Sequence, residues 1–155
     1  MINTTFKFAT DTASISIFDE AALHHRLDDP ADWWADPDEE VREVNKGDVI
    51  FVDLGADGTY TVCLHTGARQ AEGQPTLAQV DARVRCLSGR LFVGAGEDVV
   101  GAGGGPDTNL GGQFLDVKVG VYHVTLTRTG LFELDVAIGE VAGAAENSIE
   151  DSLTL

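Results

Sequence analysis

Apolar and polar residues alternate along most of this 155-residue chain, and this period of two is typical of half-buried β-strands. Ile15 and Ile17, for example, share one predicted face, while Ser14 and Ser16 share the other. Nine segments show such alternation or a short apolar run: residues 6–8, 14–17, 49–52, 60–64, 82–87, 91–93, 113–118, 121–128 and 131–138. The pattern therefore predicts a mainly β protein.

Turn and loop residues separate these segments. An Asp-Gly pair at 57–58 lies between two of the apolar runs, which is typical of a β-hairpin and predicts that residues 49–52 pair with residues 60–64. Residues 66–79 are polar and predicted to be a loop. The glycine-rich stretch 94–112 is predicted to be a flexible connection between strands.

A helical pattern interrupts the strands between residues 20 and 46. Asp19 is a candidate N-cap for a helix over residues 20–26. Asp-Pro pairs at 29–30 and 36–37 each place a capping residue before a proline suited to the first helical position, and Gly47 is a candidate stop. We expect two or three short helices in this region.

The order of elements predicts an antiparallel β-sandwich or jelly-roll-like barrel of about eight to nine strands, with a short helical insertion at roughly 20–46. The connections are too short and the helices too few for repeated βαβ units. Nothing divides the chain, so residues 1–155 are expected to form one domain. The small, polar and acidic residues 139–155 are expected to be a peripheral tail.

The charge narrows the choice of partners. Ten Lys and Arg residues face 26 Asp and Glu residues, a formal net charge of -16. Such a surface repels nucleic acids and anionic membranes and attracts a basic protein partner, although acidity also serves solubility or adaptation to salt. Cys63 and Cys86 are too few for a disulfide framework, and neither a signal peptide nor a long apolar run is evident, so a cytoplasmic location is expected.

Residues 28–43 hold eight acids, one Arg and both tryptophans, and they are the strongest candidate for a functional surface. Acids near helix N-termini have a structural role too, and at least one Trp is expected in the core. The functional interpretation is an aromatic anchor surrounded by charge that binds a basic partner. The predicted partner-binding residues are Asp32, Trp33, Trp34, Asp36, Asp38, Glu39 and Glu40.

No motif predicts catalysis, a cofactor or a metal. The glycine-rich stretch lacks the Lys of a phosphate-binding loop, and the acids of residues 28–43 do not fit an EF-hand, although a different calcium site stays open. His24, His25, His65 and His123 are scattered, and neither cysteine neighbours a histidine in sequence, so only convergence in space would create a catalytic group.

The acidic Trp-Trp segment, the stretch from Lys46 to His65 and the late strand that begins Gly120-Val-Tyr together resemble small, uncharacterised bacterial β-sandwich proteins, some of them found near toxin or secretion loci. That resemblance implies no catalytic residues.

The leading hypothesis is a non-catalytic, acidic protein-binding domain, and its most specific form is an immunity-like protein that neutralises a basic partner. One alternative is a small-ligand-binding or enzymatic β-sandwich that uses an interior cleft, and another is a structural or assembly subunit. The sequence leaves the oligomeric state open.

Overall fold

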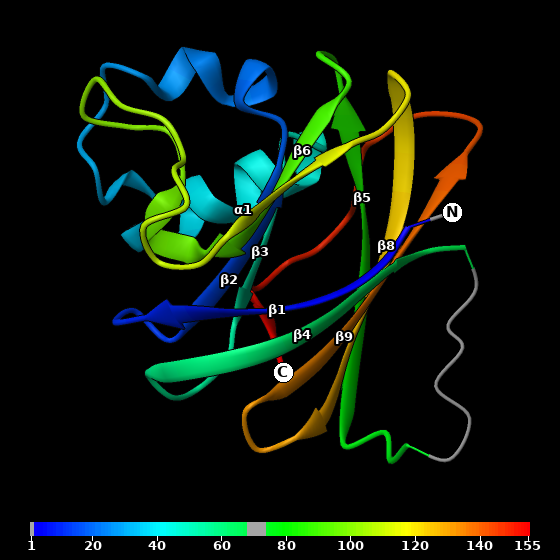
Figure 1. The fold of residues 1–155 in the computed structure, drawn as a ribbon. Coiled ribbons are helices and arrows are strands. Elements are labelled where there is room, and N and C mark those ends of the chain that lie inside the picture. Colours follow the sequence, from blue (N-terminus) through cyan, green and yellow to red (C-terminus); the bar gives the residue numbers. More distant parts are fainter. Residues whose placement is uncertain (1, 68–73) are drawn as a thin grey trace.

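A computed structural model describes residues 2–67 and 74–155, which form two five-stranded sheets packed as a β-sandwich (Figure 1). Sheet A contains, in spatial order, β1 (Asn3–Thr10), β4 (Gly58–Thr66), β9 (Glu133–Val141), β8 (Gly120–Gly130) and β5 (Ala78–Cys86). Sheet B contains β10 (Leu153–Thr154), β3 (Val49–Asp53), β2 (Ser14–Phe18), β6 (Arg90–Ala95) and β7 (Gln113–Asp116). The predicted mainly β sandwich is confirmed.

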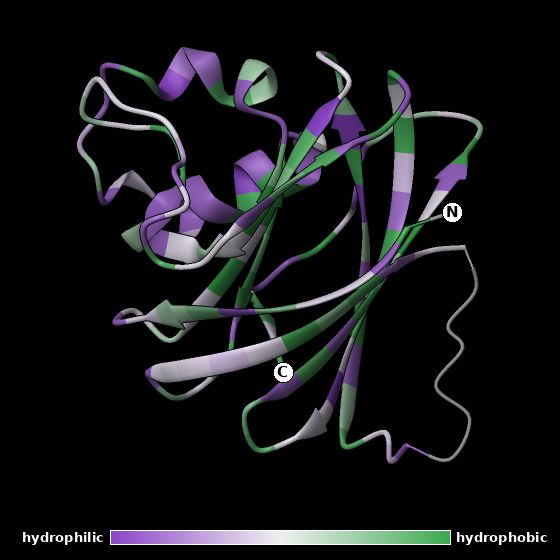
Figure 2. Cartoon of the chain, viewed as in Figure 1, coloured by the Kyte–Doolittle hydropathy of each residue, from purple (hydrophilic) through white to green (hydrophobic). Residues whose placement is uncertain are grey.

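The space between the sheets is filled by the apolar residues that the alternation assigned to one face. Ile15 and Ile17 of β2 and Val62 and Leu64 of β4 are at most 1% exposed. Figure 2 shows the corresponding bands of hydrophobic and hydrophilic residues along the strands. Burial of these aliphatic side chains is the main source of stability for such a sandwich.

A second apolar cluster lies on the outer face of sheet B, where the helical insertion packs against it. It consists of Phe18, Leu23, Trp33, Val44, Val49, Phe51, Phe92, Val99 and Val100. Because β3 is covered on both faces, its residues Val49–Val52 are all buried, which explains why this strand has a continuous apolar run and no alternation.

The predicted hairpin between residues 49–52 and 60–64 is wrong. β3 lies in sheet B between β2 and β10, whereas β4 lies in sheet A between β1 and β9, so the Asp-Gly turn carries the chain from one sheet to the other. The apolar residues on both faces of β3 favour a place inside sheet B. The antiparallel expectation holds for most pairs, but β4 pairs with β9 and β10 pairs with β3 in parallel.

The helical insertion contains η1 (Glu20–Arg26), η2 (Trp33–Ala35) and α1 (Pro37–Lys46), of which η1 and η2 are 3-10 helices. The Asp36-Pro37 start is confirmed, because the Asp36 side chain accepts a hydrogen bond from the Asp38 N–H and α1 begins at Pro37. The other predicted start, at residues 29–30, is wrong, since η2 begins only at Trp33. Gly47 ends α1 with a left-handed conformation, φ +80°.

The glycine-rich connection between β6 and β7, which includes the 3-10 turn η3 (Gly96–Asp98), is fastened to the helical insertion. Backbone N–H groups of Ala102 and Gly103 donate to the carbonyls of Asp29 and Leu27 at 2.7 and 2.6 Å. Figure 1 shows this loop beside the helices. The prediction of a flexible connection did not anticipate these anchors.

Residues 139–155 differ from the expected peripheral tail. β9 continues to Val141, and β10 adds a strand to sheet B beside β3. Between them, the Asn147 side-chain amide donates to the carbonyls of Val44 and Arg83 and accepts from the Arg83 N–H, at 2.7 to 2.9 Å. This segment therefore joins α1 to the edge of sheet A.

Candidate functional site

Three of the seven predicted partner-binding residues form an exposed acidic face where η2 meets α1. Asp32 precedes η2, Asp36 caps α1 and Asp38 lies in its first turn, and all three side chains are exposed. The N-terminus of α1 favours the negative charge of Asp36 and Asp38, so their position has a structural reason as well. These three acids are free to meet a partner.

Trp33 is a core residue. It is 6% exposed, and its indole Nε1 donates to the carbonyl of Val100 at 2.7 Å. The guanidinium of Arg26 lies 4.5 Å from the centre of its ring. Trp33 therefore links the insertion to the glycine-rich connection, in agreement with the expectation that one Trp belongs to the core.

Trp34 is half-buried and lies on the outer face of sheet B. Its ring stacks on that of Phe51 with centroids 5.0 Å apart, and its Nε1 donates to the carbonyl of Ala31 at 3.0 Å. Since part of the ring stays accessible beside the exposed acids, Trp34 is the aromatic residue suited to contact a partner.

Glu39 is held by two arginines. Its carboxylate pairs with Arg26 and with Arg42, each at 2.6 Å, and these hydrogen bonds lower the pKa of Glu39. Its charge is therefore neutralised locally, and it contributes less to the long-range field than the unpaired acids do.

Glu40 faces the protein interior. It is 8% exposed, and burial raises the pKa of Glu40 to about 7, against the effect of a hydrogen bond with Ser152 and with a smaller contribution from the nearby Asp53. The sequence offered no sign of this burial, because Glu40 stands among exposed acids in the first turn of α1.

Glu40→Gln is expected to stabilise the protein at high pH. The unfolded chain loses this proton near pH 4.5 and the folded protein only near pH 7, so the native state is destabilised as the pH rises between these values. The variant should gain about 1–3 kcal/mol at pH 8 and almost nothing at pH 4.5, in denaturant titrations at both pH values. The exposed Glu146→Gln is the control. An equal gain at both pH values in Glu40→Gln would contradict this origin.

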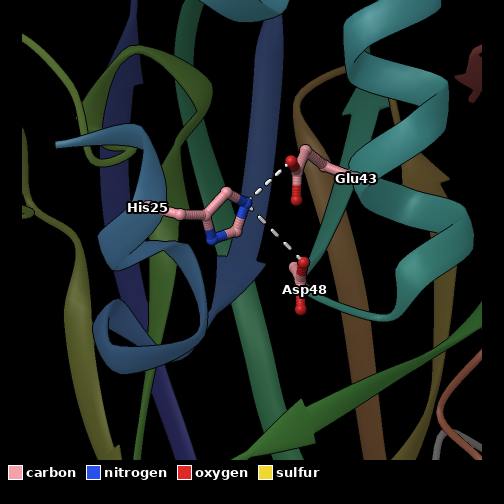
Figure 3. Close-up of side chains that lie close together, drawn as sticks. All are labelled: His25, Glu43 and Asp48. Atoms are coloured by element: carbon pink, nitrogen blue, oxygen red, sulfur yellow. Dashed lines mark hydrogen bonds and ion pairs between the residues drawn. The ribbon is translucent and has the colours of Figure 1, made fainter. Parts of the chain in front are cut away.

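A second polar group joins η1, α1 and the residue before β3. His25 Nε2 lies 2.8 Å from Glu43 Oε1 and 3.9 Å from Asp48 Oδ2. Figure 3 shows the two carboxylates on the same side of the His25 ring. Glu43 is completely buried. Burial and the hydrogen bond with Glu43 raise the pKa of Asp48 to about 6, so the two carboxyls share a proton over part of the acidic range.

The same three side chains are the group in the described part of the chain with metal-like spacing, their ligand atoms lying within 4.8 Å of one another. The surroundings do not suit a cation. Arg26 and Lys46 approach Glu43 at 3.0 and 3.7 Å, and Arg85 approaches Asp48 at 3.1 Å. Because these cations already balance the carboxylates, we interpret the group as a buried ionic link between the insertion and both sheets.

The histidines and cysteines do not assemble a nucleophile among the described residues. His65 Nε2 lies 3.0 Å from Asp135 Oδ2 on the neighbouring strand, and both residues are buried. Cys86 donates to Asp19 at 3.4 Å, and burial raises the pKa of its thiol. Cys63 lies 3.7 Å from the Thr5 hydroxyl. A reactive thiolate needs a lowered pKa, so Cys86 is unsuited to that chemistry.

An open cleft of about 490 Å³ lies beside η1, between the insertion and the edge of sheet B. Its walls are Asp19, Glu20, Ala21, His24, Ser88, Arg90, Phe92 and Phe114. Sequence reasoning did not find this cleft, because its residues come from three separate segments and none belongs to a motif. In the described part of the chain, no helix has the length and apolar character needed to cross a membrane.

These features define a class: a β-sandwich in which a short helical insertion covers one sheet and presents acids and an aromatic residue. The chain belongs to DUF6386, a family of unknown function, whose model matches residues 1–155. A comparison with curated protein sequences finds no match.

Two solved structures share the fold. One is described as crocagin biosynthetic gene J, with 15% identity, a TM-score of 0.58, and coverage of 92% of this chain and 100% of the other. The second is ComJ from Bacillus subtilis, described as an inhibitor of the DNA-degrading activity of NucA, with 8% identity, a TM-score of 0.56, and coverage of 91% and 100%. At these identities the likeness establishes the fold alone.

Proposed function

We propose that this protein is a non-catalytic, cytoplasmic binding domain that neutralises a basic protein partner, in the manner of an immunity protein. The observation that carries the proposal is the exposed acidic face of Asp32, Asp36 and Asp38 on a chain with a net charge of -16. A field of this sign speeds encounter with a basic surface and disfavours acidic competitors.

The likeness to ComJ supports the same class of activity. ComJ inhibits a DNA-degrading enzyme, and such enzymes need basic surfaces to bind their substrate. An acidic protein of the same fold is suited to occupy a surface of that kind. In this proposal the three acids steer the partner, and the accessible part of Trp34 contacts it.

The test is a charge variant of the acidic face with a matched control. Asp32→Lys, Asp36→Asn and Asp38→Lys together change the charge by +5, and the Asn at position 36 keeps a side-chain oxygen to cap α1. The control, Asp57→Lys, Glu133→Gln and Glu140→Lys, makes the same change at exposed residues elsewhere.

In pull-downs from the native host, the acidic-face variant should lose its basic partner, because its affinity drops about tenfold or more. The affinity of the control variant for the same partner should drop much less. Binding should also weaken as salt rises. Recovery of the same partner by both variants would show that the acidic face is not the binding surface.

A further inference from the structure

In the part of the chain that the structure describes, β7 is an edge strand of sheet B: it pairs with β6 and has no second neighbour. The Val117 N–H donates to the Gly89 carbonyl, and hydrogen-bonded pairs recur every second residue in an antiparallel ladder. Gln113 and Leu115 therefore bond to β6, while the backbone groups of Phe114 and Asp116 point away from the sheet.

The cleft beside η1 adjoins this edge. Phe114 belongs to both, and its ring packs edge-on against that of Phe92 with centroids 5.3 Å apart, which gives the cleft an aromatic wall. The central carbon of the Arg90 guanidinium, Cζ, lies over the Phe114 ring, 3.6 Å from its centre. The cleft thus places aromatic surface and the positive charge of Arg90 side by side.

The charges around the cleft favour a basic visitor. Asp19 is buried and saturated with hydrogen bonds, so it does not attract a ligand. Within the wall the exposed Glu20 of η1 balances the charge of Arg90, and the exposed Asp116 of β7 adds a negative charge beside the wall. The exposed acids of the insertion extend the same negative field.

We propose that an extended, basic segment of the partner protein adds a strand to the free edge of β7 and places one side chain in the cleft beside η1. This inference rests on the proposed function and specifies how the partner docks. The N–H and C=O groups of Phe114 and Asp116 supply the backbone hydrogen bonds, and the cleft selects the side chain.

The probe is the blocked octapeptide acetyl-(Lys-Val)4-amide, which is basic and favours an extended conformation. In nuclear magnetic resonance experiments on the full chain, saturating peptide should slow hydrogen exchange of the Phe114 and Asp116 amides by about tenfold or more, because both become hydrogen-bonded. Unchanged exchange at both amides, or no binding at about 1 mM peptide, would overturn the inference.

Two substitutions at one exposed position separate backbone pairing from charge. Asp116→Pro removes the N–H that faces the free edge and takes no hydrogen bond from the β6 ladder, so the fold should survive. It should weaken peptide binding about tenfold, whereas Asp116→Asn, which keeps the N–H, should weaken it about threefold or less. Equal binding by wild type and Asp116→Pro would contradict strand addition.

The acidic-face variant distinguishes this inference from the function on which it rests. If that variant loses the partner while Asp116→Pro retains it, the proposed function stands and docking at β7 fails. If neither variant loses it, both fail. If both variants lose the partner, the result supports a partner that contacts the acidic face and the β7 edge together.

Discussion

Replacement of Asp19 by alanine should lower the free energy of unfolding by about 3–5 kcal/mol, because it removes the acceptor shared by several part-buried hydrogen-bond donors at once. Asp19 is 1% exposed and lies between β2 and η1. Its carboxylate accepts from the backbone N–H groups of Ala21, Leu87 and Ser88 at 2.7 to 2.9 Å, and from the Ser88 hydroxyl at 2.9 Å. It thus caps η1 and fixes the turn between β5 and β6.

The pH dependence provides a second signature of Asp19. Burial acts to raise its pKa, but the hydrogen bonds from Ser88, Ala21 and Leu87 outweigh this and hold the pKa below its ordinary value. The stabilisation is therefore present above about pH 4 and is lost as the pH falls through the folded-state pKa. Denaturant titrations at pH 7 and pH 3 measure both effects.

Asp19→Asn is the matched variant. The asparagine keeps one acceptor oxygen and the same shape, so the free energy of unfolding of this variant should lie between those of wild type and Asp19→Ala. A loss below about 1 kcal/mol for Asp19→Ala at pH 7 would show that water replaces the carboxylate, and that the residue is not the anchor described above.

Trp33→Ala and Trp34→Ala should differ strongly, although the residues are adjacent. Trp33→Ala should cost about 3–5 kcal/mol, because it leaves a cavity in the outer cluster of sheet B and removes the bond to the Val100 carbonyl. Trp34→Ala should cost about 1–2 kcal/mol, since the ring is half-buried and stacks on one residue, Phe51.

Thermal unfolding of both tryptophan variants measures this contrast, and partner binding completes it. Trp34→Ala should weaken binding of the basic partner while the protein stays folded. Trp33→Ala should reduce binding only as far as it unfolds the protein. Equal destabilisation by the two substitutions would contradict the division of roles.

Local chemistry made part of this structure predictable. The cap at Asp36 and the stop at Gly47 depend on hydrogen bonds within a few residues, and β8 follows its predicted alternation closely. The pairing of strands was harder to predict from the sequence. Residues 49–52 showed a strand buried on both faces, but no local signal indicated that its neighbours would be β2 and β10 and not β4.

The candidate site also contains residues whose exposure followed from the local sequence and residues whose burial did not. Asp32, Asp36 and Asp38 are exposed as acids of a helix start are expected to be, whereas Glu40 turns inward toward Ser152 and Asp53, a contact that depends on residues 100 or more positions later as well as on β3. The cleft beside η1 and the free edge of β7 arise from tertiary packing, and no periodicity in the sequence predicts them.

The return of the C-terminal segment to β3 has a consequence for synthesis. Leu153 pairs with Val52, and Asn147 bridges Val44 and Arg83, so sheet B and its helical cover stay incomplete until residues 147–154 have left the ribosome. Until then β3 offers an unpaired, strongly apolar edge. Contacts at such separation also slow folding, because a long loop must close before they form. Nascent chains of this protein are therefore expected to need protection by chaperones that the finished molecule does not.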